Sequence, residues 1–258
     1  MNLYNGKIRQ KQKKSYGQHF LIDKEIIDKI IELSNIGTKD IVYEVGSGDG
    51  VLTNELCKIS KFVYSFEIDS FYYSLCKKKL YHDNLTLLNS DGFNNNLAID
   101  FDVFFSSLPY YESRHAFSWL CQKSFKKGIL LLQREFVEKL LTLPGGKNYR
   151  AISMLSQYRF SIKALLDVHS SSFYPKPKVD SVLIEIVPKT FPLTKKTIDN
   201  IQFIFSLRKK NISFLINYFN KSDIHYYGTL DIDKLKEKKI GQLSVEQLYE
   251  LTSFLNTY

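Results

Sequence analysis

The sequence predicts an α/β fold, in which a doubly wound, mostly parallel sheet precedes a small all-helical C-terminal domain. Up to residue 189, short segments rich in β-branched and aromatic residues alternate with segments whose apolar residues recur at helical spacing. This alternation is typical of βαβ units, whose right-handed crossovers place helices on both faces of one sheet. After Pro188 and Pro192 the pattern changes to helices only, so we expect a boundary near residue 190.

Each element is predicted from its own pattern, in chain order. Residues 1–14 are basic with little apolar content and are expected to form an N-terminal arm. The first helix follows Asp23, a residue type favoured at the N-cap, and carries isoleucines at helical spacing. The predicted strands are 40–45, 61–69, 85–91, 101–108, 127–133, 161–168 and 181–189. The predicted helices are 24–36, 51–60, 70–82, 115–125, 135–141, 151–160, 195–207, 211–219 and 244–255.

Length and composition are those of a soluble globular protein. The chain has 258 residues, of which 44% are hydrophobic and 24% charged, enough for one or two domains with a good core. No apolar run reaches the roughly 18 residues that cross a bilayer, and the basic N-terminus lacks the apolar segment of a signal peptide. We expect a cytoplasmic protein that acts as a monomer, away from membranes.

The net charge of +9 indicates a polyanionic partner, most simply nucleic acid. A composition rich in lysine for other reasons is the alternative. The basic clusters that we expect to contact nucleic acid contain Lys13, Lys14, Arg208, Lys209 and Lys210.

The cysteines and histidines predict no metal site. Cys57, Cys76 and Cys121 are far apart, form no CxxC pair and have no histidine at ligand spacing. Reduced, buried thiols are the expected state.

A glycine-rich turn joins the first strand of the sheet to its helix in "YEVGSGDGVLT". Gly46, Gly48 and Gly50 let the backbone turn tightly and approach a ligand closely. The pattern is GxGxG, which is neither the dinucleotide GxGxxG nor a P-loop, since no GK[ST] follows. By itself the turn also fits an ordinary strand-to-helix connection.

Acidic residues end the next two strands. Glu67 in "FEID" follows Gly48 by 19 residues, a spacing at which an acid can accept hydrogen bonds from ribose hydroxyls. Asp91 in "NSDG" belongs to the same edge and can accept from an adenine amino group. A solvated acid and a turn-forming aspartate are the alternatives for each alone. Together with the glycine turn they predict a site for an adenosine-bearing cofactor.

The motif "SSLPYY" ends the fourth strand at that edge. Pro109 fixes its own φ and favours an extended Leu108, whose carbonyl can then point into the pocket. Ser107 supplies a second acceptor and Tyr110 a flat face. Two acceptors and a stacking ring suit a planar base with an exocyclic amino group. The alternative interpretation of the motif is an ordinary turn at the end of a strand.

Taken together, these motifs resemble the rRNA adenine N6-dimethyltransferases of the KsgA/Erm family over most of the chain. "SYGQHFLID", "EVGSGDGVLT", "FEID" and "SD" are similar to the family's cofactor motifs, and "SLPYY" to its N-L-P-[YF] motif. "FYPKPKVDSVLIEIVP" is the most specific match, and "IGQLSVEQLYEL" resembles the end of the family's C-terminal domain. The late segment and the helical C-terminal domain are closest to the KsgA branch.

The resemblance implies a Rossmann-like class I methyltransferase that uses S-adenosylmethionine and no metal. Residues 15–189 would be the methyltransferase domain and 190–258 an RNA-binding domain. The implied substrate is a pair of adjacent adenosines near the 3′ end of small-subunit rRNA, methylated late in subunit assembly. Phe173 would face Tyr110 across the target base, and a core aromatic beside Pro175 is the alternative for this residue. The cofactor-binding residues that the resemblance adds are Gln18, His19, Leu21, Ile68, Gly92 and Ser107.

The chain departs from the family pattern at two positions. Ser107 stands where the family usually has asparagine, although serine occurs in other adenine-N6 methyltransferases. Its single acceptor on a shorter arm can hold the amine less well or change how the two methylations proceed. His19 stands where bacterial members usually have asparagine, and histidine is also familiar there.

Three other functions are consistent with part of this pattern. A catalytically impaired relative that binds RNA during assembly would explain Ser107. An Erm-type enzyme would methylate large-subunit rRNA. A nicotinamide dehydrogenase would share the sheet, but the missing GxGxxG and the "SLPYY" motif argue against it.

Overall fold

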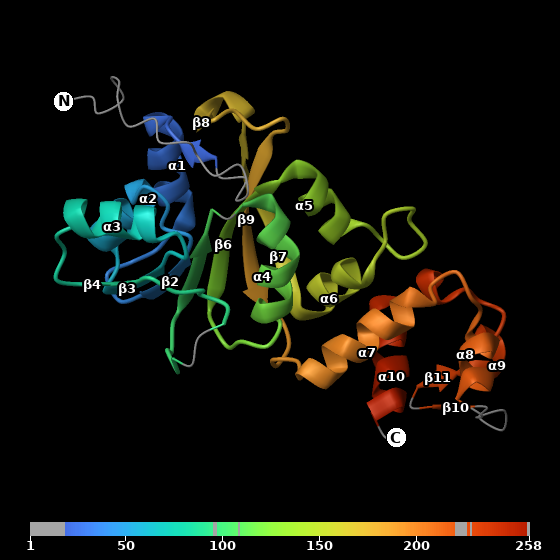
Figure 1. Ribbon diagram of the computed structural model, residues 1–258. Coiled ribbons are helices and arrows are strands. Elements are labelled where there is room, and N and C mark those ends of the chain that lie inside the picture. Colours follow the sequence, from blue (N-terminus) through green and yellow to red (C-terminus); the bar gives the residue numbers. More distant parts are fainter. Residues whose placement is uncertain (1–18, 95–96, 108, 220–225, 228, 257–258) are drawn as a thin grey trace.

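The computed structural model describes residues 19–94, 97–107, 109–219, 226–227 and 229–256 (Figure 1). In this part of the chain the main sheet has seven strands in the order β4-β3-β2-β5-β6-β9-β7. The strands from β4 to β6 are parallel, and β9 runs antiparallel to both β6 and β7. The strands are β2 (Ile41–Val45), β3 (Phe62–Phe66), β4 (Leu85–Leu88), β5 (Val103–Ser106), β6 (Lys127–Gln133), β7 (Phe160–Val168) and β9 (Ser181–Pro188).

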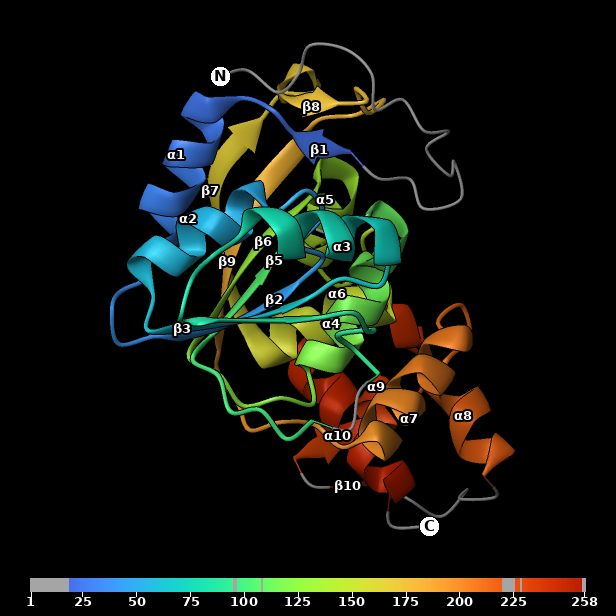
Figure 2. The same ribbon diagram turned by 60° about the vertical axis from the view of Figure 1, so that its left-hand side comes forward.

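Helices cover both faces of the sheet, which confirms the doubly wound prediction. Helices α1 to α3 lie on one side and α4 to α6 on the other in both views (Figures 1 and 2). Asp23 caps α1 as predicted, because its carboxylate accepts from the amides of Glu25 and Ile26. The helices are α1 (Lys24–Ser34), α2 (Val51–Ile59), α3 (Ser70–Lys79), α4 (Ser113–Leu120), α5 (Arg134–Leu141), α6 (Ala151–Arg159), α7 (Lys195–Ser206), α8 (Ile212–Tyr218), α9 (Ile232–Leu235) and α10 (Val245–Asn256).

The apolar strand residues divide between two cores, one on each face. Successive side chains of a strand point to opposite faces. In β2, Val42 therefore packs with α1 and α2, whereas Tyr43 packs on the side of α4. Phe104 and Phe105 of β5 separate in the same way. Strands buried on both faces explain why their sequences are nearly continuous apolar runs.

A second, two-stranded sheet pairs the start of the described chain with a distant segment. Strands β1 (Phe20–Leu21) and β8 (Phe173–Tyr174) are antiparallel, with Leu21 opposite Phe173, and lie side by side in Figure 2. Because β8 follows β7 of the main sheet, this pairing holds β1 beside the sheet.

The C-terminal region is helical as predicted, with one addition. A short hairpin, β10 (Tyr226–Tyr227) with β11 (Leu230–Asp231), lies between α8 and α9. The prediction of helices alone missed it because strands of two residues are too short to carry a period-two pattern.

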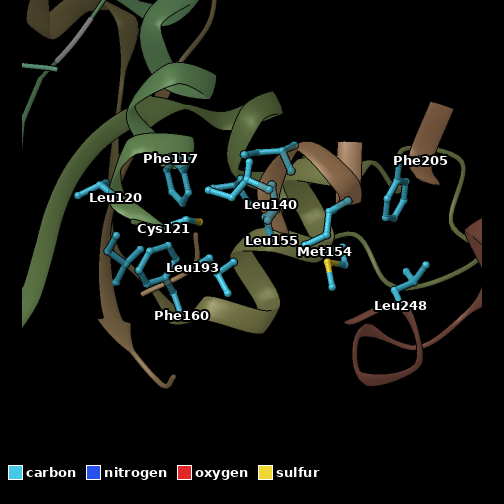
Figure 3. Close-up of a cluster of buried hydrophobic side chains, with 14 of the residues drawn as sticks. Phe117, Leu120, Cys121, Leu140, Met154, Leu155, Phe160, Leu193, Phe205 and Leu248 are labelled. Carbon is cyan, nitrogen blue, oxygen red and sulfur yellow. The ribbon is translucent and has the colours of Figure 1, made fainter. Parts of the chain in front are cut away.

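One continuous core joins the C-terminal helices to the half that contains the main sheet. Helices α6, α7 and α10 pack against one another, and their side chains continue the cluster that begins at α4 (Figure 3). The rings of Tyr158 and Tyr249 stack at 4.0 Å between α6 and α10, and those of Tyr149 and Phe205 lie 5.3 Å apart.

The buried side chain of Arg159 forms hydrogen bonds with the segment that connects the two halves. Its side chain is 1% exposed and donates to the carbonyls of Thr190 at 2.5 Å and Lys123 at 2.7 Å. The Arg159 carbonyl accepts in turn from the amide of Lys189. The segment around Lys189 and Thr190, which connects the two halves, is therefore held by hydrogen bonds to Arg159.

Candidate active site

A cavity of about 470 Å³ opens at the carboxyl ends of the parallel strands. The direction of the strand order reverses between β2 and β5, since β2 leads to β3 on one side and β5 leads to β6 on the other. Ligands of open α/β sheets bind in the crevice that this reversal leaves. The predicted site residues that line the cavity are His19, Leu21, Gly46, Gly48, Glu67, Ile68, Asp91, Gly92, Ser107, Pro109 and Phe173.

Some predicted residues lie elsewhere or outside the described part of the chain. Gln18, Leu108, Lys13 and Lys14 lie outside the described residues, as does the side chain of Tyr110. The second basic cluster, Arg208, Lys209 and Lys210, follows α7 and is not among the described residues that line the cavity.

The glycine-rich turn forms the floor of the cavity. Gly48 and Gly50 have φ of 56° and 83°, a region that side chains other than glycine's rarely adopt. A Cβ on Gly50 would lie 2.9 Å from the sulfur of Cys76, and one on Gly48 would lie 3.2 Å from the ring of Phe20. Conformation and space both require glycine here, as the sequence pattern predicted.

Glu67 ties this turn to the end of β3. Its carboxylate is nearly buried, with 3% exposure, and accepts from the amides of Gly48 and Asp69, both at 2.8 Å. Burial raises the pKa of Glu67, and the two amide hydrogen bonds oppose that effect. A carboxylate has about four acceptor sites, so Glu67 can still accept from hydroxyl groups of a ligand in the cavity.

Asp91 and Gly92 form the wall that follows β4. The Asp91 carboxylate accepts from the amide of Phe93 at 2.8 Å, so Asp91 also has the turn-forming role that the sequence offered as the alternative. A Cβ on Gly92 would lie 2.7 Å from a methyl group of Val45, so glycine allows this wall to approach β2 closely. The hydroxyl of Tyr43 donates to the Gly92 carbonyl from below.

A second acid, Glu44, lies fully buried beneath the glycine turn. It is 2% exposed, and its Oε2 accepts from Thr53 at 2.7 Å and from Ser65 at 2.5 Å. Burial raises the pKa of Glu44 to about 7, because these two hydroxyl groups only partly offset the loss of solvation and the Glu67 charge adds to it. Glu44 joins β2, β3 and α2 behind the cavity.

The small sheet of β1 and β8 closes one side of the cavity. His19 Nδ1 lies 2.6 Å from the Pro175 carbonyl, an atom that can only accept, so this nitrogen carries a proton. Phe173 lines the cavity and is also packed in the core, with 4% exposure. Its predicted contact with a target base and the simpler role of a core aromatic are thus compatible.

The opposite side is built by the residues after β5. Ser107 is half-buried on the wall, and the Pro109 carbonyl accepts from the amide of Glu112 to close a 3₁₀ turn over Tyr110–Glu112. Helix α4 begins directly after this turn, and Glu112 and His115 also line the cavity, 3.3 Å apart.

The sequence reasoning missed several residues of the lining. Phe20, Asp49 and Phe93 are immediate neighbours of predicted residues and could have been found by extending each motif. Glu112 and His115 are one helical turn apart after "SLPYY", which an earlier predicted start of α4 would have revealed.

The sheet is doubly wound, and its glycine turn, Glu67 and the proline motif after β5 meet around one cavity. This fold and site are those of a class I methyltransferase. The sequence profile of the family described as "Ribosomal RNA adenine dimethylase" matches residues 9–257. The chain belongs to this family.

Individual relatives agree with this assignment. A "Probable ribosomal RNA small subunit methyltransferase A" from Methanococcus aeolicus is 34% identical over 233 residues, which cover 88% of this chain and 84% of the relative. A "Ribosomal RNA small subunit methyltransferase A" from Thermotoga neapolitana is 31% identical over 244 residues, with coverages of 93% and 90%.

Solved structures give the same fold. A dimethyladenosine transferase from Plasmodium falciparum superposes with a TM-score of 0.75 at 27% identity and covers 92% of this chain and 98% of its own. The 23S rRNA methyltransferase ErmE has a TM-score of 0.63 at 23% identity, with coverages of 92% and 99%, a likeness of fold alone.

Within the described residues, no helix is long and apolar enough to span a membrane, and no group of three potential metal ligands is close enough to hold an ion.

Proposed function

We propose that the protein uses S-adenosylmethionine to dimethylate N6 of two adjacent adenosines near the 3′ end of small-subunit rRNA, as a step in ribosome biogenesis. The observation that carries this proposal is the meeting of two motif sets in one cavity. The glycine turn and Glu67 suit an adenosine-bearing cofactor, and Ser107 and Pro109 suit a second adenine.

The cavity fits the cofactor in size and in chemistry. A volume of about 470 Å³ is within the range of small-molecule sites. Glu67 is held rigidly by two amides and keeps acceptor sites for ribose hydroxyls, and Asp91 offers a carboxylate to an adenine amino group. S-adenosylmethionine, when bound, supplies a methyl group on a sulfonium centre that an amine nitrogen can attack.

The chain's own contribution to the reaction is positioning. Ser107 Oγ and the Leu108 carbonyl would accept the two N–H groups of the target amine, which favours a nitrogen lone pair directed at the methyl group. Tyr110 and Phe173 would hold the ring that has left its stack, and unstacking in a loop costs only a few kcal/mol. Alignment and fixed dipoles account for most of the rate, and a strong general base is not required.

The net charge and the relatives support an RNA substrate. The charge of +9 suits a polyanion, and the similar proteins from Methanococcus and Thermotoga are named for small-subunit rRNA. Arg208, Lys209 and Lys210 would contact phosphates, so binding would weaken steeply as salt rises.

The decisive experiment offers labelled S-adenosylmethionine with undermethylated small subunits and, separately, with large-subunit rRNA, followed by mapping of the modified base. Dimethylated adenosines near the small-subunit 3′ end are expected. Transfer only to large-subunit rRNA would favour an Erm-type enzyme, and cofactor binding without transfer would favour an impaired assembly factor.

Variants of Ser107 test its assignment within the same assay. We expect Ser107→Ala to slow single-turnover transfer while cofactor affinity stays unchanged, because only an acceptor for the amine is lost. Ser107→Asn, which restores the family's usual residue, should keep or raise the rate. Wild-type transfer of both methyl groups by Ser107→Ala would show that Ser107 is only a turn residue.

A further inference from the structure

A second cavity, of about 220 Å³, lies where α4, α6 and α7 meet. The three helices are neighbours in both views (Figures 1 and 2). Its wall joins the two halves of the protein, since α4 and α6 belong to the first half and α7 to the second. The polar residues that line it are Arg114, Ser118, Arg150, Gln202 and Ser206.

Two arginines provide the charge of this cavity. Arg114 is exposed in the first turn of α4, and Arg150 is half-buried at the start of α6. Nη1 of Arg150 donates to the carbonyls of Lys147 and Tyr149, both at 2.8 Å, which fixes the guanidinium and leaves its other nitrogens to donate. Across the described ranges, neither arginine has an ion pair with a carboxylate.

Helix α4 places this charge next to the active site. Residues three or four apart share a helix face, so Arg114 and Ser118 lie together on the face toward the second cavity. Glu112 and His115 are also three apart and line the active-site cavity instead. The start of α4 therefore separates the two cavities, and it follows the motif that would hold the target adenine.

The other end of the cavity leads toward the basic turn after α7. Ser206 ends α7 two residues before Arg208, and the Arg208 carbonyl accepts from the amide of Gly241. The Gly241 carbonyl accepts in turn from the amide of Gly145, in the loop that leads to Arg150. These backbone hydrogen bonds connect the turn that carries Arg208 with the loop that leads to Arg150.

We propose that the second cavity binds a phosphodiester of the RNA strand whose adenosine enters the active site. The proposal rests on the proposed function and adds to it a positioning site. Guanidinium groups match phosphate oxygens in paired hydrogen bonds, and Gln202 and Ser118 offer neutral donors beside them. A phosphate held here would anchor the backbone on the far side of α4 while the base is clamped on the near side.

The test compares Arg114→Gln, Arg150→Gln and the double variant with wild type, using binding to undermethylated small subunits at several salt concentrations. Lys29→Gln on α1, on the other side of the molecule, is the matched control for loss of one charge (Figure 1). Each arginine variant should weaken RNA binding about tenfold or more. It should also lower the magnitude of the slope of log affinity against log salt by about 0.7 per released phosphate.

Two further readouts separate a phosphate site from a structural role. If both arginines bind one phosphate, the losses of binding free energy in the two single variants should not add up in the double variant. Cofactor affinity and thermal melting temperature should stay near wild type. Arg114→Lys and Arg150→Lys should restore the salt slope but only part of the affinity, because lysine lacks the paired donors.

The outcomes distinguish this proposal from the proposed function. Wild-type methyl transfer with unchanged salt slopes in the arginine variants would overturn the phosphate site alone. Stabilisation by inorganic phosphate that the variants lose, without a change in RNA binding, would mean a free-anion site and also overturn it. A wild-type protein that neither methylates nor binds small subunits would overturn both.

Discussion

Glu44 should make the stability of the protein depend on pH near neutrality. Its folded-state pKa of about 7 lies above the ordinary value of 4.5, because the carboxyl group is buried. The folded state therefore keeps a proton that the unfolded state has already lost. The contribution of Glu44 to stability is largest below pH 4.5, falls as the pH rises toward 7, and is level above that.

The size of this effect follows from the shift in pKa. At about 1.4 kcal/mol per pH unit, moving the pKa from 4.5 to about 7 corresponds to about 3 kcal/mol in total. Glu44→Gln keeps an acceptor for Thr53 and Ser65 but cannot ionise. The variant should therefore gain about 2–3 kcal/mol relative to wild type between pH 5 and pH 8. Any pH-independent effect of the Glu44→Gln substitution on stability is the same at pH 5 and at pH 8, so it cancels in this comparison.

Urea unfolding of both proteins across this pH range measures the difference. Glu55→Gln on the same helix as Thr53 is the control, because the pKa of Glu55 lies below its ordinary value and that group stays ionised throughout. If wild type and Glu44→Gln follow parallel stability curves, Glu44 is not held protonated by burial and the reasoning is wrong.

Three further variants test other parts of the structure. Glu67→Ala should cost about 1.5–3 kcal/mol of cofactor affinity for each charge-assisted hydrogen bond lost, measured by calorimetry, and a folded variant with unchanged affinity would refute the assignment. Phe173→Ala should lower stability by about 3–5 kcal/mol, because the ring is packed in the core, and should also slow methyl transfer; a purely structural residue would leave single-turnover rates unchanged in the folded fraction. Arg159→Met removes a buried donor from two partly buried carbonyls and should destabilise by about 2–4 kcal/mol in denaturant titration; a loss below about 0.5 kcal/mol would mean that water replaces the guanidinium.

The sheet and the cofactor half of the site could be predicted because their signals are local. Apolar runs identified all seven strands of the main sheet within the described residues. The spacing from Gly48 to Glu67 predicted that both lie at one edge of the sheet, and the structure adds a direct hydrogen bond between them. These features depend on one strand and its following turn, so a short window of sequence contains them.

The contacts that the sequence could not reveal join residues distant in the chain. The pairing of Leu21 with Phe173 and the hydrogen bonds of Arg159 have no periodic pattern, because each depends on how whole elements pack. Helix α4 was predicted to begin at residue 115 but begins at Ser113, since the turn after Pro109 continues directly into it. Because of this difference of two residues, the sequence reasoning missed Glu112 and His115, which line the cavity after the proline motif.

Because α6 shares a core with α7 and α10, substitutions on α7 have different consequences on its buried face and on its exposed face. On α7, Ile201 and Phe205 are buried in the shared core, whereas Gln202 and Phe203 are exposed. Under the proposed function, changes on the exposed face would alter RNA recognition without disturbing the core of the first half. Changes on the inner face reach the first half through α6 and through Tyr149, which lies just before that helix and contacts Phe205. The proposed function then lets a lineage adapt to a different ribosome through the outer positions, while substitutions at the buried positions must be compensated in both halves of the fold.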